Sequence, residues 1–451
     1  MRHPRNRWHI FSHLTPRVHP RWILAVWVAI LIAFPTVVVD AQSGDASGPW
    51  QIERWKQTPA MRWLDRESPV RSLTYELESI AHRPGDKQGE DAQPTEVFAF
   101  YATPGTVNGD PSLDKDLPAV VLIHGGGGTA FSEWAWLWAQ RGYAAIAMDL
   151  SGRRPEAPRF NPKTRELIIQ RRVERTRLPR GGPEANHQAK FNNIGGDRSD
   201  EWQPYAVAAV IQAHSLIRSF PEVDAERTAV TGISWGGYMT CLVASLDDRF
   251  SAAVPVYGCG FLYEGESVQK PMIDALSGDQ RQQWIRDYDP SAWLPQCDVP
   301  ILLVNGTNDK HYPLDSYMKS FQAVAGPKQL RIEVAMPHGH VAGWLPNEIG
   351  LFIDQHVSGG KPLPKLESLH TTNGIAKTKI DSSTPIKTAS LHFTTDHGPL
   401  VDRSWGTQTA SIDGELLSAT VPSDATLWYL SVTDERDAMI STDVQFSVDW
   451  K

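Results

Sequence analysis

One short motif limits the possible folds of this chain more than any other feature. Residues 231–238 read Thr-Gly-Ile-Ser-Trp-Gly-Gly-Tyr, between an apolar run at 228–231 and a second run at 239–246. The first run is typical of a buried strand and the second of a helix. The glycines lack the Cβ atoms that would clash in a sharp turn, so Ser234 is expected at its tip with an exposed hydroxyl. The motif therefore predicts a strand, a turn and a helix whose N-terminus favours negative charge beside the serine.

A glycine-rich segment follows another predicted strand. The apolar run at 119–123 ends in the sequence His-Gly-Gly-Gly-Gly at 124–128. Glycines at such a place let the backbone approach a substrate carbonyl and present an N–H group to it. We expect the N–H groups of Gly125 and Gly126 to form an oxyanion hole together with that of Trp235, the residue after the nucleophile.

The predicted nucleophile needs a base and an acid. A serine hydroxyl is a poor nucleophile at neutral pH unless a histidine takes its proton and a carboxylate holds that histidine. After Ser234, the apolar run at 299–304 predicts a strand that ends close to Asp309. Ligand-facing groups collect at this edge of an open parallel sheet, so Asp309 is the predicted acid. Asp315 is the alternative acid, although we expect it to cap the next helix.

Two histidines compete for the role of base. The predicted strand at 330–335 leads into Met-Pro-His-Gly-His at 336–340. We predict His340 as the base, because the glycine before it frees the loop to swing the imidazole over the sheet edge. His338 remains the alternative base, and in this prediction it packs the loop.

Four motifs in this order resemble those of the α/β-hydrolase superfamily. They lie at residues 124–128, 232–238, 305–309 and 337–340. Within the superfamily, they resemble the branch that joins acetyl xylan esterase-like and dienelactone hydrolase-like enzymes to the catalytic domain of prolyl oligopeptidases. The resemblance extends over about residues 117–357 and implies an α/β-hydrolase fold, with a mostly parallel, doubly wound sheet.

The resemblance also implies a serine hydrolase that forms an acyl-enzyme. In it, Ser234 would attack the carbonyl, His340 would transfer the proton and Asp309 would orient His340. Two functions stay open: a carboxylic-ester hydrolase acting on acetylated carbohydrate or other short acyl esters, and a peptidase of the prolyl oligopeptidase type. Since peptidases of that branch carry a β-propeller for which this sequence offers no room, we expect the esterase.

The first 41 residues have the pattern of a secretory signal peptide. Residues 1–21 contain five arginines and no acidic residue, and residues 22–39 are almost wholly apolar. The small residues Val39 and Ala41 suit signal peptidase, so we expect cleavage near Ala41 and a secreted or periplasmic product without stable membrane association. The alternative is a retained membrane anchor, because an apolar run of roughly 18 residues can just span a bilayer.

Charge and cysteine content exclude several functions. The formal net charge is −8 and becomes −12 without residues 1–41, which disfavours nucleic-acid binding. The arginine-rich stretch at 171–177 is interrupted by Glu174 and is expected to be a solvated helix face. With three cysteines and no zinc-binding spacing, we predict no metal and no cofactor. The expected partner is a small-molecule or polysaccharide ester, and the sequence does not define an oligomeric state.

Changes in composition divide the chain into segments. An N-terminal arm with the edge strands of the sheet is predicted for residues 42–116, and the catalytic core for 117–357. The long Arg-, Pro- and Gly-rich connection at about 150–200 is expected to be an insertion of the kind that forms a lid. Residues 358–365 are the predicted linker, and the alternating Thr- and Ser-rich runs of 366–451 predict a small β-sandwich-like appendage.

Overall fold

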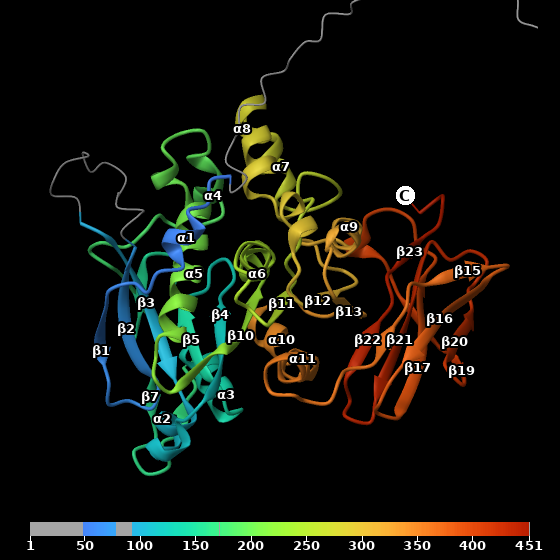
Figure 1. Ribbon diagram of the computed structural model, residues 1–451. Helices are drawn as coiled ribbons and strands as arrows, with labels where there is room; N and C mark the ends of the chain where they lie inside the picture. The colour runs from blue at the N-terminus through green and yellow to red at the C-terminus, as the bar shows by residue number, and fades with distance from the viewer. Residues whose placement is uncertain (1–47, 78–92, 171, 451) are drawn as a thin grey trace, which may run out of the picture. The chain divides into compact units, whose positions relative to one another are not determined.

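The computed structural model describes residues 48–77, 93–170 and 172–450 (Figure 1). The predicted signal peptide at 1–41 lies outside the described residues. Within these ranges, no helix combines the length and the apolar composition needed to cross a membrane.

One mixed sheet forms the centre of the catalytic part, with the strand order β1-β2-β3-β5-β4-β10-β11-β12-β13. The first three strands pair antiparallel: β1 (Met61–Asp65), β2 (Arg71–Leu77) and β3 (Thr95–Ala102). The other six pair parallel with one another: β4 (Leu117–Ile123), β5 (Ala144–Met148), β10 (Val223–Ile233), β11 (Ala252–Val256), β12 (Ile301–Gly306) and β13 (Lys328–Glu333). Their near-continuous apolar sequences suit strands that helices cover on both faces.

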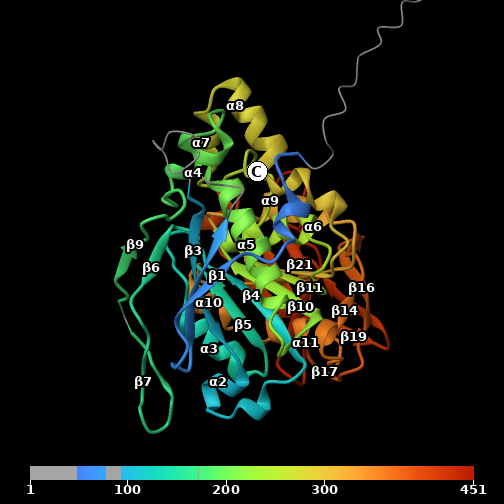
Figure 2. The ribbon, with the colours of Figure 1, turned by 60° about the vertical axis from the view of Figure 1, so that its left-hand side comes forward.

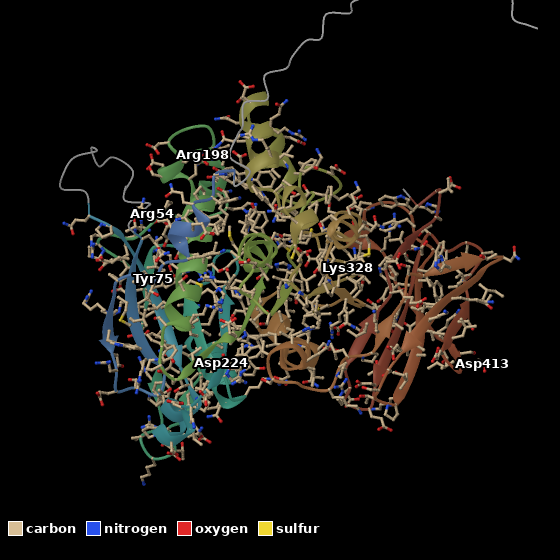
Figure 3. All side chains as sticks on the ribbon, in the orientation of Figure 1. Arg54, Tyr75, Arg198, Asp224, Lys328 and Asp413 are labelled. Atoms are coloured by element: carbon tan, nitrogen blue, oxygen red, sulfur yellow. The ribbon has the colours of Figure 1, made fainter. Side chains whose placement is uncertain are left out.

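Helices cover both faces because the chain moves outward from β4 in two directions. Right-handed crossovers place α3, between β4 and β5, on one face, and α5, α6 and α9, which lead toward β13, on the other. The principal helices are α3 (Ser132–Gln140), α5 (Trp202–Arg218), α6 (Trp235–Leu246), α9 (Leu314–Ala323) and α11 (Asn347–Val357). An ion pair joins Arg141, after α3, to Asp354 of α11. The hydroxyl of Tyr75 on β2 donates to Ala209 O of α5 at 2.6 Å. Figure 3 labels Tyr75.

Shorter helices lie in the connections. They are α1 (Ile52–Trp55), α2 (Pro104–Asn108), α4 (Ala189–Asn192), α7 (Lys270–Asp274), α8 (Gly278–Gln283) and α10 (His340–Trp344).

The strand register brings the functional loops together. Gly232 of β10 pairs with Ile123 of β4, and Ile233 pairs with Val256 of β11, so these strands end at the same edge. Gly306 of β12 pairs with Glu333 of β13 at that edge as well. The glycine-rich segment, the nucleophile turn and the two loops after β12 and β13 therefore face one another.

The segment between β5 and α5 contains two antiparallel ribbons. Strand β6 (Arg153–Pro155) pairs with β9 (Arg175–Arg177), and β7 (Arg159–Phe160) pairs with β8 (Leu167–Ile168). The ribbons extend as an arm away from α4 (Figure 2). The prediction of a helix face at 171–177 is wrong, because part of this stretch is strand β9. A helix there would have no apolar face to bury, whereas pairing with β6 satisfies its backbone.

The C-terminal part is a β-sandwich of two sheets, in line with the predicted β-rich segment. One sheet contains β17 (Ile386–Thr394), β18 (Gly406–Thr409), β21 (Leu427–Asp434), β22 (Met439–Ser441) and β23 (Gln445–Phe446). The other contains β14 (Lys365–Leu366), β15 (His370–Thr372), β16 (Ile375–Asp381), β19 (Ser411–Asp413) and β20 (Leu416–Thr420). A separate small core lies between them, with Leu391, Leu417 and Leu430 fully buried.

The first of these sheets continues the central sheet. Strand β22 pairs antiparallel with β13 through Leu330 and Ser441, which gives a sheet of 14 strands. Residues 48–450 accordingly lie in one compact unit. Residues 366–451 are predicted to be an appendage behind a linker, whereas strand pairing between β13 and β22 joins the two sides of that linker. Alternation in a sequence predicts strands but does not identify the edge with which they pair.

Candidate active site

Ser234 lies at the turn between β10 and α6 in a strained conformation. Its backbone has φ 60° and ψ −117°, a region that residues other than glycine rarely adopt. The flanking glycines are required by space: a Cβ at Gly236 would lie 2.0 Å from Ile123 O, and one at Gly232 would lie 2.2 Å from Gly236 O. The tight turn is held by the N–H of Ser234, which donates to Val256 O at 2.8 Å.

Two hydrogen bonds connect Ser234, His338 and Asp309 in series. His338 Nε2 lies 2.9 Å from Ser234 Oγ, and His338 Nδ1 lies 2.6 Å from Asp309 Oδ2. Because a carboxylate only accepts, it holds the imidazole in the tautomer with the proton on Nδ1 and leaves Nε2 to accept from the serine. The other oxygen of Asp309 accepts the N–H groups of His311 and Tyr312 at 2.7 and 3.0 Å.

The prediction that His340 contacts Ser234 and Asp309 is wrong. His340 is the first residue of α10, and its Nε2 accepts the N–H of Gly125 at 2.9 Å. Gly339 has φ 178°, an extended conformation that any residue adopts, so the loop does not use the freedom of glycine on which the prediction relied. Burial, with smaller effects from His124 and His338, lowers the pKa of His340 to about 4.

Asp315, the alternative acid, is the second residue of α9 and its carboxylate accepts the N–H of Ser316 at 2.8 Å. Pro313 occupies the N-cap position that was expected for it. An acidic side chain in the first turn still interacts favourably with the helix dipole.

The predicted oxyanion donors differ in whether their N–H groups already have an acceptor. A Cβ at Gly126 would be 2.7 Å from Trp235 Cδ1, so the glycine-rich segment packs directly on the nucleophile turn. Among the described residues, the N–H groups of Gly126 and Trp235 have no recorded acceptor, and Trp235 begins α6. The N–H of Gly125, by contrast, is occupied by His340. Gly126 and Trp235 are therefore the pair available for an oxyanion.

Aromatic residues that the sequence analysis did not select hold the imidazole of His338. The rings of Tyr257 and His311 lie 4.6 and 4.5 Å from it, and the ring of Tyr312 lies nearly parallel at 6.3 Å. Tyr257 also donates its hydroxyl to Pro337 O at 2.7 Å. Burial, with the neighbouring His338, lowers the pKa of His311 to about 4. The available sequence signal was the position of His311 and Tyr312, two and three residues after Asp309.

The insertion between β5 and α5 contacts the glycine-rich segment and Trp235. Arg175 of β9 donates to the carbonyls of Gly128 and Gly127 at 2.7 and 3.1 Å. Lys190 of α4 is buried, with its ammonium 5.1 Å from the ring centroid of Trp235, and burial lowers its pKa to about 7. Both halves of the candidate oxyanion hole are thus backed by the insertion.

In the ranges 48–77, 93–170 and 172–450, no group of three or more His, Cys, Asp or Glu side chains is placed to hold a metal ion. The three cysteines, Cys241, Cys259 and Cys297, are buried and do not form disulfides.

Comparison with known families agrees with this architecture. Residues 180–348 match the prolyl oligopeptidase family, and the matched range contains Ser234, Asp309 and His338. The match and the strand order agree with an α/β-hydrolase fold. The matched range is thus similar to a serine hydrolase domain, and the resemblance stated from the motifs is confirmed.

One curated relative and two solved structures illustrate the range of similar proteins. The uncharacterized peptidase YuxL of Bacillus subtilis (strain 168) is 25% identical over 245 residues, which cover 51% of this chain and 31% of the relative, so the chain spans about a third of its length. An acetyl xylan esterase from Paenibacillus sp. R4 is 19% identical and covers 68% of this chain and 92% of its own, with a TM-score of 0.47. Acetyl xylan esterase 1 from Thermoanaerobacterium sp. JW/SL YS485 is 14% identical and covers 68% and 91%, with a TM-score of 0.48.

Proposed function

We propose that the protein is a carboxylic-ester hydrolase for short acyl esters, with acetylated carbohydrate as the substrate class. The observation that carries the proposal is the series of hydrogen bonds from Ser234 through His338 to Asp309, at 2.9 and 2.6 Å. Ser234 Oγ attacks the ester carbonyl while His338 Nε2 takes its proton, and Asp309 stabilises the imidazolium. The N–H groups of Gly126 and Trp235 hold the oxyanion. His338 then protonates the departing alcohol, and water releases the acyl group by the same steps in reverse.

Two features support an ester with a small acyl group. Rings of Tyr257, His311 and Tyr312 pack around the imidazole that bonds to Ser234, and we infer that they leave room for a small acyl group. An alcohol also leaves with less help from the general acid than an amine does. A single histidine serving as base and acid is therefore sufficient for ester cleavage.

The second candidate is a serine peptidase of the prolyl oligopeptidase type. The family match at residues 180–348 favours it, as does the similarity to a relative named as a peptidase. The two candidates share every step except the leaving group, so only substrate kinetics separates them.

The test compares esters with amides on the purified protein. We expect kcat/KM to be highest for acetyl esters, to fall as the acyl chain grows, and to exceed that for proline-containing peptide amides by at least ~10²-fold. A fluorophosphonate should label the wild type but not Ser234→Ala. Efficient cleavage of an unactivated peptide bond, with esters no better, would promote the peptidase.

Export forms a separate part of the proposal. It is supported by the basic and apolar pattern of residues 1–41 and the small residues before position 42. Mass analysis of the native product should find an N-terminus near Gln42. Recovery of the intact leader in the membrane fraction would favour an anchored protein.

A further inference from the structure

The C-terminal sandwich reaches the candidate active site through the side chain of Asn308. This residue immediately precedes Asp309, and its amide Nδ2 donates to the carbonyls of Arg403 and Val401 at 2.8 and 3.0 Å. Those carbonyls belong to the connection between β17 and β18, around a single helical turn at Leu400–Asp402. A segment about 90 residues away in the sequence thus contacts the loop that carries the acid.

The same side chain extends the contact to the histidine loop. Thr307 donates its hydroxyl to Asn308 Oδ1 at 2.6 Å, and Thr307 Oγ1 accepts the N–H of Ala335 at 2.9 Å. Ala335 has φ 53°, in the left-handed region, and begins the loop that carries His338. The donors and acceptors alternate correctly along this series, because the amide NH₂ faces only carbonyls and the amide oxygen faces a hydroxyl.

The sandwich end of the series is firmly held. Arg403 is 4% exposed, and its guanidinium donates to Gly398 O at 2.7 Å and to Trp450 O. Leu400 is buried, and its N–H donates to Glu266 Oε2 at 2.7 Å in the catalytic part. Asn308 is therefore bonded to a fixed support.

We propose that Asn308 is a positioning residue, through which the C-terminal sandwich sets the placement of Asp309 relative to His338. The proposal rests on the proposed function for its kinetic consequences. The acid and the histidine follow different strands, β12 and β13, and their hydrogen bond requires both loops to be fixed. Misplacement of a reacting group by about 1 Å can reduce the rate ~10²-fold. The sandwich is thus part of the active-site structure.

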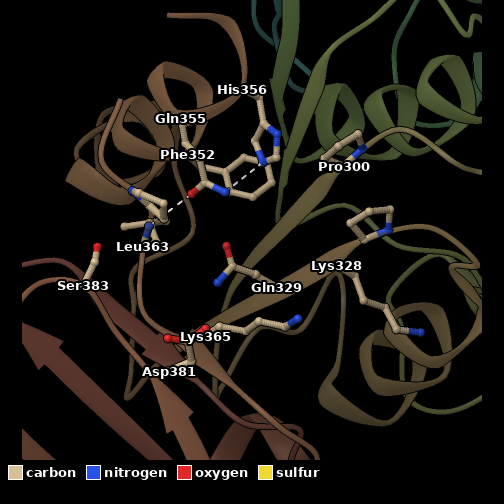
Figure 4. Close-up of a pocket in the computed structure, with 12 residues that line it drawn as sticks. Pro300, Lys328, Gln329, Phe352, Gln355, His356, Leu363, Lys365, Asp381 and Ser383 are labelled. Atoms are coloured by element: carbon tan, nitrogen blue, oxygen red, sulfur yellow. Dashed lines mark hydrogen bonds between the residues drawn. The ribbon is translucent and has the colours of Figure 1, made fainter. Parts of the chain in front are cut away.

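The chain offers a matched control at the other end of β13. Gln329 Nε2 donates to Pro364 O at 2.8 Å, so it is also a side-chain amide bonded to a carbonyl beyond α11. It lies beside a cavity of about 410 Å³ lined by Phe352 and Leu363, and by residues of the sandwich (Figure 4). Gln329→Ala removes a comparable contact without touching the loops after β12 and β13.

The kinetic test uses the full-length mature protein with Asn308→Ala, Asn308→Asp and Gln329→Ala. Asn308→Asp keeps the acceptor for Thr307 but loses the donor to the sandwich, so it should fail like Asn308→Ala. We expect both Asn308 variants to lose about 10–100-fold in kcat on an acetyl ester, with KM within about threefold and an altered pH profile of kcat/KM. Gln329→Ala should stay within about twofold. Wild-type kcat and pH profile in both Asn308 variants, with only a lowered Tm, would overturn the proposal.

A spectroscopic measurement separates this proposal from the proposed function. The His338 proton on Nδ1, bonded to Asp309, should give a low-field proton NMR signal that disappears in His338→Ala. The signal should broaden or move upfield in both Asn308 variants and persist in Gln329→Ala. If the wild type hydrolysed no ester, the proposed function would fail while this measurement still decided the role of Asn308, and an unchanged signal in both Asn308 variants would refute that role.

Discussion

Replacement of Ser234 by glycine should make the fold more stable than replacement by alanine. Ser234 has φ 60° and ψ −117°. A side chain held in such a region costs about 1–3 kcal/mol, and the strain persists only because the surrounding structure imposes it. Alanine retains the Cβ atom and hence the strain, whereas glycine relieves it.

The expected difference can be worked from opposing contributions. Glycine loses about 0.5–1 kcal/mol through the greater conformational freedom of its unfolded chain. Both variants lose the hydrogen bond from Ser234 Oγ to His338, so that loss cancels in the comparison. Ser234→Gly should therefore exceed Ser234→Ala by about 0–2.5 kcal/mol in the free energy of unfolding, with about 1 kcal/mol as the central expectation.

Urea unfolding followed by tryptophan fluorescence measures this difference, with midpoints compared at a common slope. Both variants should be inactive, so activity cannot distinguish them and stability is the quantity to compare. A Ser234→Gly variant no more stable than Ser234→Ala would refute the claim that the nucleophile turn stores strain.

Four further variants test the residues around Ser234. His338→Ala should lower kcat on an acetyl ester by about 10⁶-fold, whereas His340→Ala should cost at most about tenfold and lower the Tm, because a backbone N–H loses its acceptor; equal losses would contradict the assignment. Because burial lowers the pKa of Lys190 from 10.5 to about 7, the unfolded chain binds the extra proton between these values and wild-type stability should rise with pH there. Lys190→Met should show a smaller rise in denaturant titrations, and an unchanged slope would exclude this source. Tyr312→Phe should keep or raise the free energy of unfolding, since the buried hydroxyl lies near the Ser234 hydroxyl but makes no hydrogen bond of good geometry with a described residue; a loss above about 1 kcal/mol would contradict this.

The parts of the site that could be predicted are those set by local backbone chemistry. The turn at Ser234 depends on glycines two residues to either side, and Asp309 follows a strand that its apolar sequence already indicates. The choice between His338 and His340 depends instead on where α10 begins and on the contact with Gly125, both of which are tertiary facts. The residue spacing alone predicts neither the start of α10 nor the contact with Gly125.

The pairing of β22 with β13 could likewise not be predicted from the sequence. An edge strand of a parallel sheet offers its unpaired N–H and C=O groups to any strand nearby, and a short alternating run has no sequence mark that selects it. The single paired position, Leu330 with Ser441, is supported by side-chain bonds such as that from Ile332 N–H to Ser441 Oγ at 3.0 Å. Such support appears only once the two segments are placed together.

The two histidines of the loop after β13 divide the work that one was predicted to do. His338 bridges the nucleophile and the acid, while His340 accepts the N–H of Gly125 and so fixes the start of the glycine-rich segment. An imidazole can accept only in its neutral form, and burial keeps the pKa of His340 near 4, so the contact survives throughout the neutral range. With Gly125 held in this way, the adjacent N–H of Gly126 remains available beside that of Trp235. In the proposed mechanism, His340 therefore supports the oxyanion hole rather than the proton transfer.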